Sequence, residues 1–136
     1  MENCSFCKPE YRKNDAYFED IFFYVTFDIH PVSPGHSIVI PKRHIADFMD
    51  ITLDEWKNLL QTIQNAIKII ETTDLRKVYA KFIEAHLTDN SILFCQEAIK
   101  HPRINTKPDA YNHGINDGKA AGRTIAHLHI HIIPRF

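Results

Sequence analysis

The stretch His127-Leu128-His129-Ile130-His131-Ile132-Ile133-Pro134 decides the fold of this chain. Three histidines alternate with aliphatic residues, and alternate side chains of a β-strand point to opposite faces of the sheet. The pattern therefore predicts a strand that packs Leu128, Ile130 and Ile132 into a core and presents three imidazoles on its other face. Pro134 has no backbone N–H to donate, so we expect it at the end of this strand.

Three titratable rings on one face of a strand indicate a functional site. Two plainer interpretations are a solvent-facing strand that happens to use histidine and a metal-binding tract. Neither explains why the opposite face is uniformly apolar, nor why a glycine-containing loop, residues 117–124, comes directly before the histidines.

The composition is that of a globular domain with an ordinary core, since 44% of the 136 residues are hydrophobic and 24% are charged. We expect one domain over residues 1–136. A net charge of -1 excludes a dedicated nucleic-acid or membrane-surface binder. No apolar run approaches the ~20 residues of a membrane span, and Met1–Cys4 has no signal-peptide pattern. We therefore expect a cytoplasmic protein.

Several other segments read as strands. Residues 17–27 are aromatic and β-branched, which predicts one or two strands with a turn near Glu19-Asp20. Residues 36–41 form an apolar run that predicts a central strand. Residues 110–116 alternate again and lead through the loop into the histidine stretch, which predicts a β-hairpin.

A long helix begins after Thr52, because Thr52 and Glu55 form a capping box. Its apolar residues recur at helical spacing: Trp56, Leu59, Leu60, Ile63, Ile67 and Ile70. We expect Trp56 in the core or at a subunit interface. Residues 75–87 and 91–100 are candidates for two further helices.

Less chemistry is expected from the segment between the long helix and the hairpin. Cys95 lies in an apolar stretch and is expected to be a buried, inert thiol. His86 and His101 are expected on the surface.

Adjacent imidazoles on a fixed strand suit nucleophilic catalysis at phosphorus. A neutral ring nitrogen attacks the phosphoryl group, and water then hydrolyses the phospho-histidine. His129 has a histidine on each side and is the best-supported nucleophile, with His131 as phosphate contact or proton donor. Backbone N–H groups of the loop 117–124 can hold phosphate oxygens.

Two of the three cysteines form Cys4-x-x-Cys7, a spacing used in metal and redox sites. A redox motif would follow a strand and open a helix, which this one does not. Cys4, Cys7, His44 and His127 together make a Cys2His2 set suited to structural zinc. The residues alone do not select which histidines complete it.

Taken together, these motifs closely resemble the histidine-triad (HIT) family. The resemblance rests on His127-x-His129-x-His131, on Cys4-x-x-Cys7, on Pro34 to His44 and on Asn112 to Pro134. It covers most of the chain except about residues 74–108. The chain is most similar to the small zinc-bearing prokaryotic branch, with diadenosine-polyphosphate hydrolases and purine nucleoside phosphoramidases.

The resemblance implies an α+β fold, with an antiparallel sheet, a long helix and an N-terminus held by zinc, and a homodimer built partly through that helix. It implies hydrolysis at the α-phosphate of a purine nucleotide conjugate through a nucleotidyl-histidine on His129. The implied catalytic residues are His36, His129 and His131; the nucleotide contacts are Asp28, Ile29, Asn116, Gly122, Arg123 and Thr124; and the ligands of a structural zinc are Cys4, Cys7, His44 and His127. No cofactor is implied for catalysis.

The chain departs from the family pattern in two places. Arg123 stands where the family usually has Gln; it either grips additional phosphates or points outward. Residues 74–108 form an extended helical insertion that covers the pocket, alters the dimer or decorates the surface. At the third triad position the chain has His131 rather than Gln, which favours hydrolysis over nucleotide transfer by resemblance.

Two rival functions remain beside hydrolysis through His129. One is a non-catalytic nucleotide-binding or interaction protein of the same fold. The other is a zinc-dependent hydrolase that uses His127, His129 and His131 as ligands, since side chains at i and i+2 of one strand can share a metal.

Overall fold

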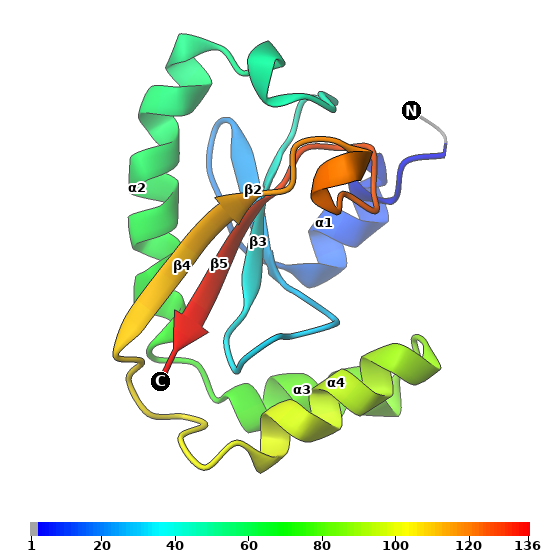
Figure 1. Cartoon of the computed structure of the whole chain (residues 1–136), viewed down its shortest axis with the longest axis vertical. Coiled ribbons are helices and arrows are strands. Elements are labelled where there is room, and N and C mark those ends of the chain that lie inside the picture. The colour runs from blue at the N-terminus through cyan, green and yellow to red at the C-terminus, as the bar shows by residue number, and fades with distance from the viewer. Residues whose placement is uncertain (1–2) are drawn as a thin grey trace.

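The computed structural model describes residues 3–136, and its centre is one antiparallel sheet of five strands in the order β1-β2-β3-β5-β4 (Figure 1). The strands are β1 (Ala16–Glu19), β2 (Phe23–Phe27), β3 (Ser37–Pro41), β4 (Ala110–Ile115) and β5 (Ile130–Arg135). Four helices accompany them: α1 (Pro9–Asp15), α2 (Leu53–Ile70), α3 (Leu75–Glu84) and α4 (Asp89–Lys100). The α+β prediction and the hairpin of β4 with β5 are confirmed.

The two faces of the sheet have different covers. One face packs against α2, and its cluster includes Val25, Val39, Ile130 and Ile132 with Leu59, Ala66 and Ile70 of α2. The other face carries Tyr24, Ile38 and Ile40 against Cys4 and Phe6 of the N-terminal segment. His131 pairs directly with Ile38, so its side chain lies on this second face. The sheet thus has one face that packs into the main hydrophobic core and a second face that carries the His131 side chain.

Helix α2 begins as predicted, with its capping box formed. The Glu55 backbone N–H donates to Thr52 Oγ1 over 3.1 Å, and the Thr52 N–H donates to Glu55 Oε1 over 2.9 Å. Trp56 and Leu60 remain 50% and 65% exposed. Trp56 is therefore not in the core, and only the interface half of its prediction stays open.

The histidine stretch corrects the sequence prediction. Regular strand β5 begins only at Ile130, so His127 and His129 lie before it. Pro41 O accepts from the His127 ring and Ile45 O accepts from the Leu128 N–H, and these contacts replace ladder hydrogen bonds. The strand also ends at Arg135, one residue beyond Pro134. Leu128, Ile130 and Ile132 are nonetheless all buried, as the alternation predicted.

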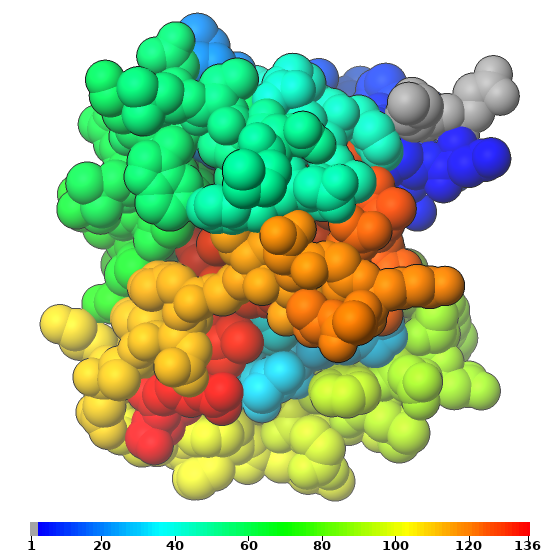
Figure 2. Space-filling view, turned by 45° about the horizontal axis from the view of Figure 1, so that its top comes forward, coloured from blue at the N-terminus to red at the C-terminus, as the bar shows by residue number. Residues whose placement is uncertain are grey.

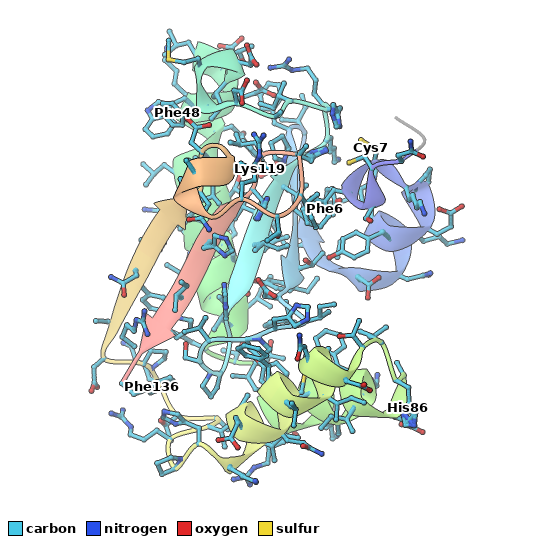
Figure 3. The ribbon with its side chains drawn as sticks, turned by 45° about the vertical axis from the view of Figure 1, so that its right-hand side comes forward. Phe6, Cys7, Phe48, His86, Lys119 and Phe136 are labelled. Carbon is cyan, nitrogen blue, oxygen red and sulfur yellow. The ribbon has the colours of Figure 1, made fainter. Side chains whose placement is uncertain are left out.

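Helices α3 and α4 form a hairpin at one end of the sheet (Figure 1). His86 lies exposed near the turn between them, as expected (Figure 3). His101 is instead half-buried against Phe136, with 4.6 Å between ring centroids. Cys95 is fully buried.

Gly35 explains the sharp bend before β3. Its φ is +92°, and a Cβ there would lie 2.8 Å from Ile70 Cγ2. Its backbone N–H donates to Tyr79 Oη of α3 over 2.7 Å, which fastens the loop between β2 and β3 to the helical hairpin.

Among the described helices, none has the length and hydropathy to cross a bilayer.

Candidate active site

A pocket of about 670 Å³ lies on the second face of the sheet. Three loops enclose it: the N-terminal turn, residues 28–36 between β2 and β3, and residues 116–125 before β5. Figure 2 shows the last of these in orange, above the light-blue loop 28–36 and the yellow-green helical hairpin. The lining residues are Ser5, Phe6, Tyr11, Asp28, Ile29, His30, His36, Ile38, Phe94, Asn116, Gly122, Thr124, Ile125, His129 and His131.

Most residues predicted for catalysis and nucleotide binding come together in this pocket. The exception is Arg123, which does not line it. Its Nη1 donates to Ala46 O over 3.0 Å and lies 3.2 Å from Asp47 Oδ1. The guanidinium is thus turned toward the segment that precedes α2, which is the outward of the two orientations left open above. This geometry does not support a contact with bound phosphate.

The backbone fixes the tautomer of His129. Its Nδ1 lies 2.8 Å from His127 O. A carbonyl oxygen only accepts, so Nδ1 of the neutral ring carries the proton and Nε2 keeps its lone pair. Phe6 packs edge-on at 5.4 Å between ring centroids, from the side of the N-terminal segment that faces the sheet (Figure 3). The pocket therefore contains one oriented imidazole nitrogen free to act as a nucleophile.

A second chain of hydrogen bonds orients His36 and His131. The Val32 backbone N–H donates to His36 Nδ1 over 3.0 Å, so the proton of the neutral ring is on Nε2. His36 Nε2 then donates to His131 Nδ1 over 2.9 Å. His131 in turn carries its proton on Nε2. The pocket thus holds a free nitrogen on His129 and an N–H donor on His131, with 5.1 Å between the two ring centroids.

The predicted metal ligands also converge, beside the pocket. Nδ1 of His127 lies 3.3 Å from Cys4 Sγ, 3.5 Å from Cys7 Sγ and 3.1 Å from His44 Nδ1. Zinc bonds of about 2.0–2.3 Å in a tetrahedron separate such ligand atoms by about 3.3–3.8 Å. The Nε2–H of His127 donates to Pro41 O over 2.8 Å, which leaves Nδ1 free to bind a metal. These four side chains fit a structural zinc ion.

A second group of possible ligands lies within the pocket. Asp28, His36 and His131 bring ligand atoms within 4.8 Å of one another. Two of those atoms already share the His36–His131 hydrogen bond. Neither group within residues 3–136 contains His129, so the structure does not gather the three triad histidines around one ion.

The comparisons with known proteins agree with this geometry. The family model described as "HIT domain" matches residues 11–136, more than half of the chain. The chain belongs to the HIT family.

Three relatives illustrate where it stands within that family. A protein of Dictyostelium discoideum named bis(5'-adenosyl)-triphosphatase is 28% identical over 124 residues, which cover 91% of this chain and 62% of that protein. A HIT family protein of Bacillus subtilis superposes with a TM-score of 0.66 at 26% identity, over 98% of this chain and 74% of its own. A zinc-bound histidine-triad protein of Mycobacterium smegmatis superposes with a TM-score of 0.60 at 27% identity, over 99% of this chain and 76% of its own. The chain thus spans less than two thirds of the Dictyostelium relative.

Burial keeps His36 and His131 of this HIT protein uncharged. It lowers the pKa of His36 to about 4, although the nearby Asp28 carboxylate works in the opposite direction. Burial also lowers the pKa of His131, with a further contribution from His129. Both rings are therefore neutral near pH 7, as the hydrogen bonds from Val32 to His36 and from His36 to His131 require.

Asp28 holds the bend of the loop 28–36. Its Oδ1 accepts from the His30 backbone N–H over 2.8 Å, and its Oδ2 lies 3.5 Å from His36 Nε2. One carboxylate oxygen of Asp28 therefore accepts a hydrogen bond from the loop, and the residue also lines the pocket.

Several lining residues were not predicted from the sequence. Tyr11 belongs to α1, which no pattern indicated, and Phe94 belongs to α4, far from any motif. These two aromatic side chains could have been found only from the positions that α1 and α4 take in the fold. His30 directly follows the predicted Asp28-Ile29 pair, so its position in the sequence could have indicated it as a lining residue.

Proposed function

We propose that this HIT protein is a nucleotide hydrolase that cleaves nucleotide conjugates at the α-phosphate through a covalent adduct on His129. One observation carries the proposal: the carbonyl of His127 holds the His129 ring with its Nε2 unprotonated, in a pocket beside the N–H donor of His131. The name of the Dictyostelium relative, a bis(5'-adenosyl)-triphosphatase, supports this class of substrate.

The reaction proceeds in two displacements. His129 Nε2 attacks the α-phosphorus, a P–N bond forms, and the bond from phosphorus to the leaving-group oxygen or nitrogen breaks. The His131 Nε2–H is the group placed to donate a hydrogen bond to the leaving atom. Water then attacks the phosphorus, the P–N bond breaks, and a nucleoside monophosphate leaves with His129 restored. Over the two steps the leaving group takes up one proton from solvent and the attacking water gives one back.

The remaining lining residues divide by chemistry around this step. Asn116, Gly122 and Thr124 offer amide and hydroxyl groups to the phosphate oxygens. Asp28 is suited to the ribose hydroxyls and Ile29 to the base. The substrate class is therefore a purine nucleotide joined to a second nucleotide, a phosphate chain or an amine.

We also propose structural zinc at Cys4, Cys7, His44 and His127. When bound, the ion links the N-terminal segment to the residue that orients His129. Removing it with a chelator should lower the melting temperature, and activity should fall only as far as the protein unfolds, because no step of the reaction uses the metal. Loss of activity at an unchanged melting temperature would contradict this and favour metal-dependent hydrolysis.

The direct test measures release of nucleoside monophosphate from diadenosine tetraphosphate, an adenosine phosphoramidate and an adenylated lysine. His129→Ala should reduce turnover of each by at least 10³-fold, as expected for loss of a nucleophile. His86→Ala is the matched control, since His86 is an exposed histidine remote from the pocket. Tight binding of AMP by wild type without any turnover would favour the non-catalytic binding protein.

A further inference from the structure

The α3–α4 hairpin reaches the pocket through one side chain, Phe94. This residue is 43% exposed, and its ring meets that of His30 edge-on, with 5.7 Å between centroids and 88° between planes. His30 also lines the pocket and follows directly after Asp28-Ile29. The two rings thus make one aromatic wall from segments 64 positions apart in sequence.

Buried hydrogen bonds hold this wall in place. Ser91, one turn before Phe94 in α4, donates its hydroxyl to Ile29 O over 2.7 Å. At the other end of the loop, the Gly35 N–H donates to Tyr79 Oη over 2.7 Å. Ser91 and Tyr79 are both fully buried. The helical hairpin therefore fixes the loop 28–36 at two points and places Phe94 beside it.

The chemistry of the wall suits a flat, apolar ligand group. Aromatic side chains at a pocket edge offer a face or edge to a planar ring, and base–aromatic contacts contribute without hydrogen-bond readout. The proposed catalytic and phosphate-binding residues are all polar or backbone groups, and Phe94 belongs to neither set. It remains available to contact the base. Its neighbour Leu93 is more exposed, at 59%, but does not line the pocket.

We propose that Phe94 and His30 form the wall of the base subsite, so that the α3–α4 hairpin determines base preference. The inference rests on the proposed function, and it gives residues 74–108 a role in covering the pocket. A purine, with its two fused rings, covers more of this wall than a pyrimidine. The subsite therefore favours purine conjugates through contact area.

The test compares Phe94→Ala, Phe94→Tyr and the matched control Leu93→Ala with wild type. The substrates are an adenosine 5'-phosphoramidate and the corresponding ribose 5-phosphoramidate, which lacks a base. Phe94→Ala should raise KM for the adenosine compound about 10-fold with kcat nearly unchanged, since stacking on one aromatic ring is of this size. Phe94→Tyr should restore KM, Leu93→Ala should have no effect, and the base-free substrate should not distinguish the variants.

Equilibrium binding of AMP separates failure of this inference from failure of the proposed reaction. If wild type binds AMP but turns nothing over, a weaker Kd for Phe94→Ala still supports the base subsite. Equal KM and Kd for Phe94→Ala and wild type would overturn it. So would an equal rise in KM for the base-free substrate, which would show that Phe94 only supports the loop.

Discussion

Backbone groups assign the protonated nitrogen of each key histidine. Pro41 O and His127 O each accept a ring proton, from His127 and His129 respectively, while the Val32 N–H occupies Nδ1 of His36. Three chemically identical rings are thereby suited to the three different roles proposed for them: metal ligand, nucleophile and hydrogen-bond relay. Side-chain type alone does not distinguish these roles; the partner of the second ring nitrogen does.

Burial of neutral His36 predicts acid sensitivity. Its pKa is about 4 in the folded protein and near 6.5 when unfolded, so the unfolded chain binds more protons between these values. The free energy of unfolding should therefore fall as the pH falls from about 6.5 to about 4, with no contribution from His36 above that window. Urea unfolding at several pH values measures this.

His36→Gln provides the comparison for that experiment. The variant lacks the titrating ring, so its free energy of unfolding should decline less steeply with acid than that of wild type. Parallel pH profiles for the two proteins would contradict the assignment of the acid sensitivity to His36.

The position of Arg123 predicts a modest kinetic effect. Because its guanidinium contacts Ala46 and Asp47 rather than the pocket, Arg123→Gln should change KM for a nucleotide substrate less than about 3-fold. Loss of the partly buried contact should cost about 1 kcal/mol of stability. Asn116→Ala, which removes a lining amide, should raise KM much more. Equal increases in the two variants would place Arg123 on the phosphate after all.

Helix α2 depends on its first turn for part of its stability. The Thr52 hydroxyl accepts from Glu55 N–H, and Glu55 is buried and paired with Arg43 at 2.8 Å. Thr52→Ala should lower the free energy of unfolding by about 1 kcal/mol, measured by urea denaturation. Thr72→Ala, which removes an exposed hydroxyl after the helix, is the control and should have little effect. A similar loss in both variants would argue against the capping box.

Local patterns were enough to predict β1 to β4 and α2, whereas most of the expected site residues followed only from the resemblance to the HIT family. The capping box and the period-two alternations are properties of neighbouring residues, so the chain itself carries them. The start of β5 was not predictable, because the strand is delayed by contacts of residues 127 and 128 with Pro41 and Ile45, far away in sequence. Likewise, Phe94 enters the pocket only because α4 docks on Ile29. Tertiary contacts decided both outcomes.

An apolar surface surrounds the start of α2. It consists of Phe48, Met49, Leu53, Trp56 and Leu60, which are 38%, 87%, 65%, 50% and 65% exposed. A patch of this kind on a protein surface marks an interface. We therefore expect the homodimer to form here, with Trp56 between the two copies.

Sedimentation of variants tests that expectation. Trp56→Glu places a charge in the interface and should convert the dimer into a monomer at micromolar concentration. Leu87→Glu is the control, because Leu87 is 46% exposed but lies in the connection between α3 and α4, outside the patch at the start of α2. A wild-type protein that sediments as a monomer would contradict the expectation that this apolar patch mediates self-association.

The order of the strands has a consequence for synthesis on the ribosome. β5 is the last strand of the sheet to be made, yet it lies between β3 and β4. Until residues 127–135 emerge, β3 and β4 each keep an open edge, and Cys4 and Cys7 lack His127 beside them. A nascent chain therefore completes the pocket lining and the proposed metal-ligand set at the same late stage. A chain truncated before Ile130 would expose unpaired strand edges, which favour aggregation.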